Sequence, residues 1–310
     1  MNRHWASTGE AGALRGMRFM VWAYNFAGRP LFNFMLFFVI SYFYVRRGPA
    51  RRASRDYLRR IRERYPESLS RAPLWWLSFR QFYAFGQATL DKYLSAVGVR
   101  APIQMDPEVD ELLFEQKPAH EGCLLVGEHF GNIEYSQIIA DDHPEVTINV
   151  LMHDQHARNF ARLLEEKVPD RRVNLIRVTD IDFDLALNLR QRVERGEWVV
   201  IAGDRVPVSD SGRVCEPQFM GATARFPIGP YVLASLLQCR VYLLHCFQLK
   251  GGYHIGVEEF AERIAPERSR RHAAYEEYAQ KFATALEAQV IRAPLQWFNF
   301  YDFWGSNAED

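Results

Sequence analysis

The segment CLLVGEHFGNIE, residues 123–134, decides how this chain is expected to fold. It opens with four apolar residues, 123–126, a run whose length is typical of a buried strand. Gly131 and Asn132 then favour a turn, and the apolar residues that follow indicate a helix. His129 is therefore expected at the carboxyl end of a strand, which is where open α/β sheets bind their ligands.

Glu134 follows His129 at a spacing that permits a catalytic pair only if the chain turns between them. Five residues of straight helix rotate by about 500°, which would point the two side chains apart. With a turn at residues 131–132, the carboxylate can hold one imidazole nitrogen and leave the other as a general base. The alternative is a histidine that caps a helix or bonds the backbone, with Glu134 as a solvated acid of the first turn.

Composition narrows the classes of function. The length of 310 residues suggests one or two domains with a large core. The 38 basic residues balance the 38 acidic ones, so the chain has no overall signature of a nucleic-acid partner. Three of the four cysteines lie in apolar runs and none has C-x-x-C spacing, which favours reduced, buried thiols in a cytoplasmic environment.

The N-terminal part is expected to associate with a membrane. The densest apolar and aromatic run, residues 31–45, is shorter than the ~20 residues that a span requires, and no A-x-A cleavage site follows it. A buried core helix, a short span and a helix lying in the membrane interface are all open interpretations. The arginine-rich segment that follows, residues 51–65, indicates a surface for anionic lipid, or a solvated helix packed on the rest of the protein. We therefore predict a membrane-associating helical segment over residues 1–65.

Residues 66–310 are predicted to form one catalytic α/β domain. After an aromatic helix over residues 73–95, apolar runs of strand length alternate with helical patterns, which indicates a mostly parallel central sheet flanked by helices. The predicted strands are residues 123–126, 146–152, 173–178, 198–202, 241–247 and 254–257. The predicted helices are residues 157–168 and 183–193, one ending at 237, and one at 272–292. A cluster of aromatic residues over 297–304 is too dense for a disordered tail.

A second set of polar side chains follows the predicted strand 198–202. Carboxyl ends of parallel strands share one edge of a sheet, so Asp204 and Arg205 can converge with His129. A surface ion pair between Asp204 and Arg205 is the alternative.

His153 and His156 follow another predicted strand and form a possible metal pair. Their spacing differs from the i, i+4 spacing of zinc hydrolases, so we predict no metal. A metal-dependent hydrolase that uses His129, His153 and His156 stays open as an alternative class. The chain contains no G-x-S-x-G, P-loop or G-x-G-x-x-G motif, so a serine-hydrolase elbow and the usual nucleotide cradles are excluded.

The motif HFGNIE, residues 129–134, resembles the signature of the lysophospholipid acyltransferase superfamily, in particular the bacterial branch that contains the late acyltransferases of lipid A. Further segments are similar to motifs of that branch in the same order along the chain. They are the second acidic motif at 203–205, FMG through Pro227, and PLQW at 294–297. Arg158–Asn159 partly matches the family's Arg/Asn motif. The opening residues 4–10 and 50–55 resemble a subgroup encoded with bacterial aryl-polyene and related lipid clusters.

The resemblance implies transfer of an acyl group from a thioester of acyl carrier protein or coenzyme A to a hydroxyl or amine of a membrane lipid, without a resident cofactor, a metal or an acyl-enzyme. It implies a location at the cytoplasmic face of a bacterial inner membrane, monotopic or with one short span, against an anionic surface. His129 is then expected to be the base and Glu134 its orienting acid. The residues expected to bind substrate are Gly131, Asn132, Arg158, Asn159, Asp204 and Arg205. A non-catalytic membrane-binding protein on the same scaffold is the remaining alternative.

Overall fold

The computed structural model describes residues 13–96, 98–116, 121–133, 138–139, 143, 145–153, 173–178, 183–206 and 213–305. The chain divides into two compact units. The first unit comprises Met1–Arg100 together with Val290–Asp310, and the second comprises Ala101–Gln289. The boundary predicted at residue 65 therefore falls inside the first unit, which also takes in the C-terminal residues.

A seven-stranded sheet forms the centre of the second unit, with strand order β1-β11-β10-β2-β5-β3-β4. Among its described pairings only β10–β11 is antiparallel, so the predicted mostly parallel sheet is confirmed. The strands are β1 (Ile103–Met105), β2 (Cys123–Gly127), β3 (Ile148–His153), β4 (Val173–Val178), β5 (Trp198–Ala202), β10 (Arg240–Leu249) and β11 (Gly252–Ala261). Two small antiparallel ribbons join β6 (Val214–Cys215) to β9 (Phe226–Pro227) and β7 (Gln218–Phe219) to β8 (Ala222–Thr223).

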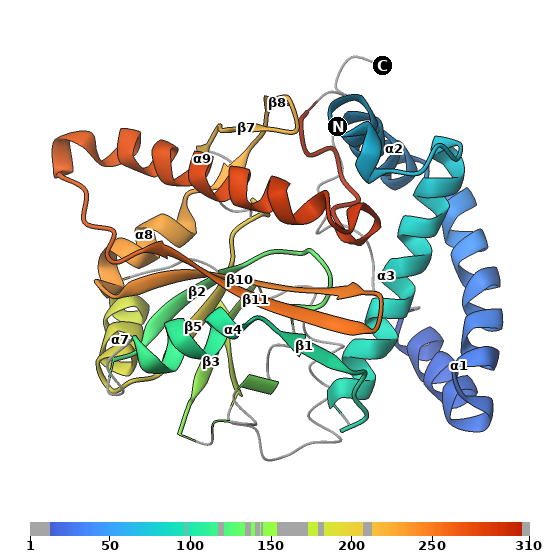
Figure 1. Cartoon of the computed structure of the whole chain (residues 1–310), viewed down its shortest axis with the longest axis horizontal. Helices are drawn as coiled ribbons and strands as arrows, with labels where there is room; N and C mark the ends of the chain where they lie inside the picture. Colours follow the sequence, from blue (N-terminus) through green and yellow to red (C-terminus); the bar gives the residue numbers. More distant parts are fainter. Residues whose placement is uncertain are drawn as a thin grey trace. The chain divides into compact units, whose positions relative to one another are not determined.

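Helices cover both faces of this sheet, as the sequence predicts. Figure 1 shows α9 running along one side of the sheet and α4 on the other. The core on the α4 side contains Leu125 of β2 and Leu244 of β10, while the neighbouring residues of each strand point toward α9. The helical segments of this unit are α4 (Pro107–Asp110), the π-turn η3 (Glu111–Glu115), α7 (Phe183–Glu194), α8 (Gly229–Leu237), the 3₁₀ turn η6 (Arg268–Arg270) and α9 (Arg271–Val290).

Most of the predicted elements of this unit have a counterpart in the structure. The strands predicted at 173–178 and 198–202 match β4 and β5 residue for residue. β5 is an apolar run closed by Gly203, whereas β4 carries polar residues at 174 and 177. The strand predicted at 254–257 extends over all of β11, since it pairs along the length of β10. The pattern gave no indication of β1 or of the four ribbon strands, which have only two or three residues each. The helix predicted at 157–168 lies outside the described residues.

Three helices make up most of the first unit: α1 (Ala13–Arg46), α2 (Gly48–Arg64) and α3 (Leu74–Ala96), with a 3₁₀ turn η2 (Pro66–Ser68) after α2. Helix α1 packs on α3 through residues that recur at helical spacing, so the two helices share an apolar interface. The buried residues of α1 are Met20, Ala23, Phe32, Leu36, Ile40 and Tyr44.

Helix α1 is broken in its middle. Ala27 and Gly28 have non-helical backbone angles, and the φ of +69° at Gly28 is one that glycine adopts at low cost. Pro30 follows and lacks the N–H that would continue the helix across this point. The guanidinium of Arg29 hydrogen-bonds the buried carboxylate of Asp91 on α3. The break is therefore fixed by backbone geometry and by an ion pair.

The C-terminal residues complete the interior of the first unit. Gln81 Nε2 donates to the Trp297 carbonyl at 2.6 Å, and Tyr57 Oη donates to the Pro294 carbonyl at 2.8 Å, beside the 3₁₀ turn η7 (Pro294–Gln296). The Trp297 ring is buried against Tyr57, with 4.9 Å between their centroids. Segments from the N-terminal and C-terminal parts of the chain therefore share one core. Residues 297–304, predicted to be structured rather than a disordered tail, are part of this packed unit.

We predict that Trp297→Ala lowers the free energy of unfolding of this unit by about 3–5 kcal/mol, because it removes a large buried ring. Trp75→Ala is the matched control, since that ring is 55% exposed. It should change the free energy by less than about 0.5 kcal/mol. Thermal unfolding followed by circular dichroism gives both values. Equal losses in the two variants would contradict the packing described here.

Candidate functional site

The carboxyl ends of β2 and β5 bring the candidate residues together. These strands are parallel neighbours, with Gly127 opposite Ala202. The pairing continues past both strands, because the Gly203 amide donates to the Gly127 carbonyl at 2.8 Å. A Cβ at Gly203 would crowd Val126 and Phe282, so glycine is needed for this close approach. His129 and Asp204 consequently follow the two strands at one edge of the sheet.

The carboxylate of Asp204 bonds His129 twice. Its Oδ1 lies 2.7 Å from His129 Nδ1, and its Oδ2 accepts the His129 backbone N–H at 3.1 Å. The Asp204 side chain is fully buried, whereas the His129 side chain is 37% exposed. The carboxylate favours the tautomer in which Nδ1 carries the proton, and it fixes the orientation of the ring. This is the arrangement of a general base that is held by an acid.

The turn after His129 is pinned to β10. Gly131, with φ of +67°, forms a parallel bridge with Cys246, and the Asn132 amide donates to the Cys246 carbonyl at 2.7 Å. The buried Phe130 ring packs on Phe247, with 4.8 Å between centroids. His129 is thus presented by a short segment whose following residues are fixed in the core.

Two residues that the sequence predicts to bind substrate have other partners in the structure. The backbone N–H of Asn132 already donates to the Cys246 carbonyl, so it is not available to hold an oxyanion. Asp204 was assigned to substrate positioning, and the structure instead places its carboxylate, without solvent exposure, on His129. The sequence places His129 and Asp204 at the same edge of the sheet, but it does not show that β2 and β5 are neighbours. Because the two strands are neighbours, Asp204 can reach His129.

The other predicted residues are only partly described. Glu134, Arg158, Asn159 and His156 lie outside the described residues, as does the side chain of His153, so the His129–Glu134 pair stays a prediction. Arg205 follows Asp204 directly and is half-buried. Within the described ranges, no group of three or more His, Cys, Asp or Glu side chains is placed to hold a metal ion.

A second buried histidine–carboxylate pair lies beside the first. Glu128 Oε1 is 2.7 Å from His245 Nδ1, and both side chains are almost fully buried. Burial alone would lower the pKa of His245, but attraction by Glu128 and Glu258, together with the hydrogen bond to Glu128, raises it to about 9. The Glu128 carboxylate therefore favours the protonated form of this buried histidine. This pair was not predicted from the sequence, although a glutamate next to His129 and a histidine inside an apolar run were available as signals.

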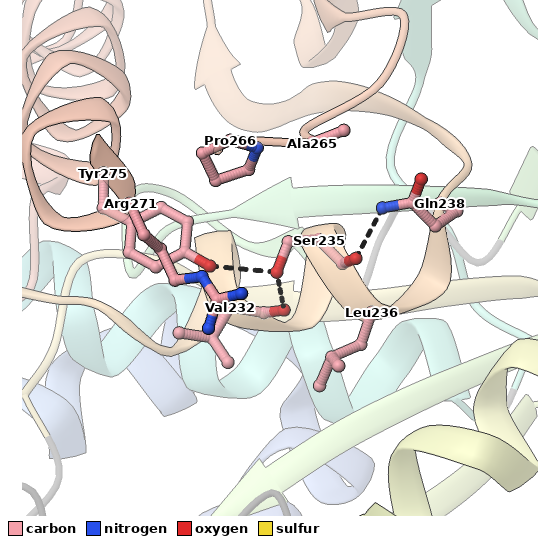
Figure 2. Close-up of a pocket in the computed structure, with 8 residues that line it drawn as sticks. All are labelled: Val232, Ser235, Leu236, Gln238, Ala265, Pro266, Arg271 and Tyr275. Carbon is pink, nitrogen blue, oxygen red and sulfur yellow. Dashed lines mark hydrogen bonds between the residues drawn. The ribbon is translucent and has the colours of Figure 1, made fainter. Parts of the chain in front are cut away.

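A pocket of about 290 Å³ lies away from these residues (Figure 2). It is lined from α8, α9 and the chain after β11, and Ser235 Oγ lies 2.9 Å from Tyr275 Oη within it. Gln238, which lines it, comes just before β10, whose first residue pairs with Cys123 at the amino end of β2. The pocket is therefore at the opposite edge of the sheet from His129 and does not belong to the site.

Comparison with known protein families agrees with the geometry. A family model described as bacterial lipid A biosynthesis acyltransferase matches residues 87–305. The match includes His129, Asp204, Glu128 and His245. A search of the curated proteins found no match.

We predict that Gly131→Ala disrupts the site, because a Cβ there would overlap the Cys246 carbonyl oxygen and the backbone of Phe247. Gly221→Ala is the matched control, since Gly221 has a similar φ of +79° but nothing within 4 Å of its added Cβ. The control should cost only the backbone strain, about 1 kcal/mol. Thermal unfolding should show a clearly larger loss for Gly131→Ala. Similar losses would mean that the turn is not held against β10.

Proposed function

Because this chain belongs to the bacterial lipid A biosynthesis acyltransferase family, we propose that it transfers a fatty acyl group from an acyl thioester to a hydroxyl or amine of a lipid, with His129 as the general base. Membership of this family supports acyl transfer on lipid substrates in general. The observation that supports the specific assignment is the 2.7 Å contact between His129 Nδ1 and the buried Asp204 carboxylate.

The proposed reaction follows from that contact. With Nδ1–H directed to Asp204, His129 Nε2 takes the proton from the acceptor as its oxygen or nitrogen attacks the thioester carbonyl carbon. Asp204 stabilises the imidazolium that forms, as the acid of a catalytic triad does. The tetrahedral intermediate then collapses with cleavage of the C–S bond, and the imidazolium returns its proton to the leaving thiolate. The Gly131 amide stays our candidate for holding the oxyanion, and Glu134 and Arg205 stay candidates for orienting the base and the substrate.

The donor in this proposal is a thioester of acyl carrier protein or coenzyme A, and the acceptor is a membrane lipid or lipid precursor. The resemblance of the opening residues to the aryl-polyene subgroup supports an acceptor from lipids of that kind. A metal-dependent hydrolase and a non-catalytic membrane-binding protein are the competing functions. A metal-dependent hydrolase would lose activity with a chelator, and a non-catalytic membrane-binding protein would show no acyl transfer.

Membrane attachment is the second part of the proposal. In the described part of the chain, Phe19–Arg46 is the one stretch long and apolar enough to cross a bilayer by length and composition. It is interrupted by the break at residues 27–28, and Arg29 lies inside it, paired with Asp91. A straight span across this stretch is disfavoured, because it would place an ion pair and unsatisfied backbone groups in hydrocarbon.

The outward face of α1 favours a helix lying in the membrane interface. Large apolar side chains are exposed along both arms of the helix. They are Phe19, Trp22, Phe26, Phe34, Phe37, Phe38, Tyr42, Phe43 and Val45. Exposed arginines such as Arg52 and Arg59 follow on α2 and suit an anionic surface. We therefore infer a monotopic protein at the cytoplasmic face of a bacterial inner membrane.

His129→Ala should abolish acyl transfer, because it removes the proposed general base. Asp204→Asn should lower the rate by about 10²- to 10⁴-fold, because the imidazolium loses its counter-ion. His272→Ala is the control, since this histidine also faces a glutamate but is exposed on α9. The assay follows a radiolabelled acyl group from acyl carrier protein, and separately from coenzyme A, into membrane lipid. Wild-type rates in His129→Ala, or loss of activity with a chelator, would contradict the assignment.

Replacing any one of Phe26, Phe34 and Phe38 by serine should weaken binding to vesicles by at least about tenfold, because burying one such ring in the membrane is worth more than about 1.4 kcal/mol. Leu187→Ser, on an exposed position of α7, should have no effect. Changing Arg52 and Arg59 to Gln should weaken binding to anionic vesicles and leave binding to neutral vesicles unchanged. Vesicle flotation measures all three. Labelling of a cysteine placed at residue 8 from the periplasmic side of intact membranes would instead show that the helix spans.

A further inference from the structure

Three ionisable side chains form a row across the sheet, on its α9 side: Glu258 of β11, His245 of β10 and Glu128, just after β2. Asp204, which follows β5, the next strand in the order, ends the row. The period-two alternation of strands explains the row. Leu125 of β2, Leu244 of β10 and Val257 of β11 belong to the core on the α4 side, so residues of opposite parity point toward α9.

Glu128 Oε1 lies 2.7 Å from His245 Nδ1 in a hydrogen bond. His245 Nε2 lies 3.4 Å from Glu258 Oε1, close enough for an ion pair but without a hydrogen bond. From α9, the neutral Gln289 donates through Nε2 to the same Glu258 oxygen at 2.7 Å. Glu258 is half exposed, whereas Glu128 and His245 are almost completely shielded from water.

The protonation of the row follows from its surroundings. Burial raises the pKa of Glu128, the His245 cation opposes that rise, and the nearby Asp204 and Glu258 charges add to it. The second oxygen of Glu128, Oε2, is buried and has no hydrogen-bond partner within the part of the chain that the structure describes. Among the described residues, His245 is the cation that favours the ionised form of Glu128.

We propose that Glu128 is a positioning residue for the His129 base: its carboxylate, kept ionised by His245, increases the proton affinity of His129 through the field that it exerts on the His129–Asp204 pair. This inference rests on the proposed function, since it concerns the same base. In this proposal Glu128 does not contact the substrate. It is adjacent to His129 in the chain and interacts electrostatically with Asp204.

The charges of the row give the direction of the effect. When His129 is neutral, the charges of Glu258, His245, Glu128 and Asp204 are negative, positive, negative and negative in that order. Protonation of His129 adds a positive charge next to the Asp204 carboxylate, so that negative and positive charges then alternate. Glu128 thus favours the imidazolium that forms when His129 takes a proton from the acceptor.

The test is the titration of His129, measured by NMR on protein with ¹⁵N-labelled histidine and assigned with His129→Ala. Glu128→Gln should lower the pKa of His129 by about one unit, because removing a nearby negative charge disfavours the imidazolium. The acid limb of the pH–rate profile should move to lower pH by the same amount. Glu145→Gln is the control, since this glutamate is exposed and pairs with His143.

His245→Gln should shift His129 in the same direction as Glu128→Gln. Without its cation, the buried Glu128 takes up a proton and loses its charge. The double variant should then shift His129 no further than either single variant. Thermal unfolding shows which variants fold, and the nearly isosteric Glu128→Gln carries the test alone if His245→Gln does not.

An unchanged His129 titration in a folded Glu128→Gln variant would overturn the inference. Additive shifts in the double variant, or an upward shift in His245→Gln, would overturn the role given to His245. The titration does not depend on turnover. Failure of the acyl-transfer assay with the expected shifts would count against the proposed function alone, whereas activity without the shifts would count against this inference alone.

Discussion

The buried carboxylate of Asp204 is the constraint on which the site depends. A charge without solvent exposure is costly unless it is hydrogen-bonded, so the segments after β2 and β5 must close on one another to supply His129 Nδ1 and the His129 amide. That closure requires glycine at residue 203 and a strand pairing that continues beyond the last residue of each strand. The histidine is thereby fixed by the backbone as well as by its ring. Movement of either strand end would leave a carboxylate without partners.

The sequence was sufficient to predict the sheet and the edge at which the site lies. Buried parallel strands are continuous apolar runs, and the residues that end these runs locate His129 and Asp204 at carboxyl ends. The sequence could not show that β2 and β5 are neighbours, because strand order is set by packing between segments far apart in the chain. For the same reason it could not show that the Asn132 N–H donates to the Cys246 carbonyl on β10. This N–H is therefore not available to hold an oxyanion.

Buried charge is also hard to infer from a pattern. His245 lies in an apolar run and is a single polar residue there, so only the position of Glu128 on the adjacent strand shows that it is paired. In the first unit, the densest apolar run, residues 31–45, comes directly after Arg29 and Pro30. The structure shows helix on both sides of these residues, because Gly28 supplies a bend and Asp91 neutralises Arg29.

The shared core of the two chain ends has a consequence for biosynthesis. A ribosome makes α1, α2 and α3 first, and it makes Trp297 and its neighbours last. Until residues 294–304 emerge, Tyr57, Gln81 and the surrounding aromatic rings lack the groups that cover them in the finished protein. A chain that stops before residue 294 would therefore keep the surface around Tyr57 and Gln81 uncovered.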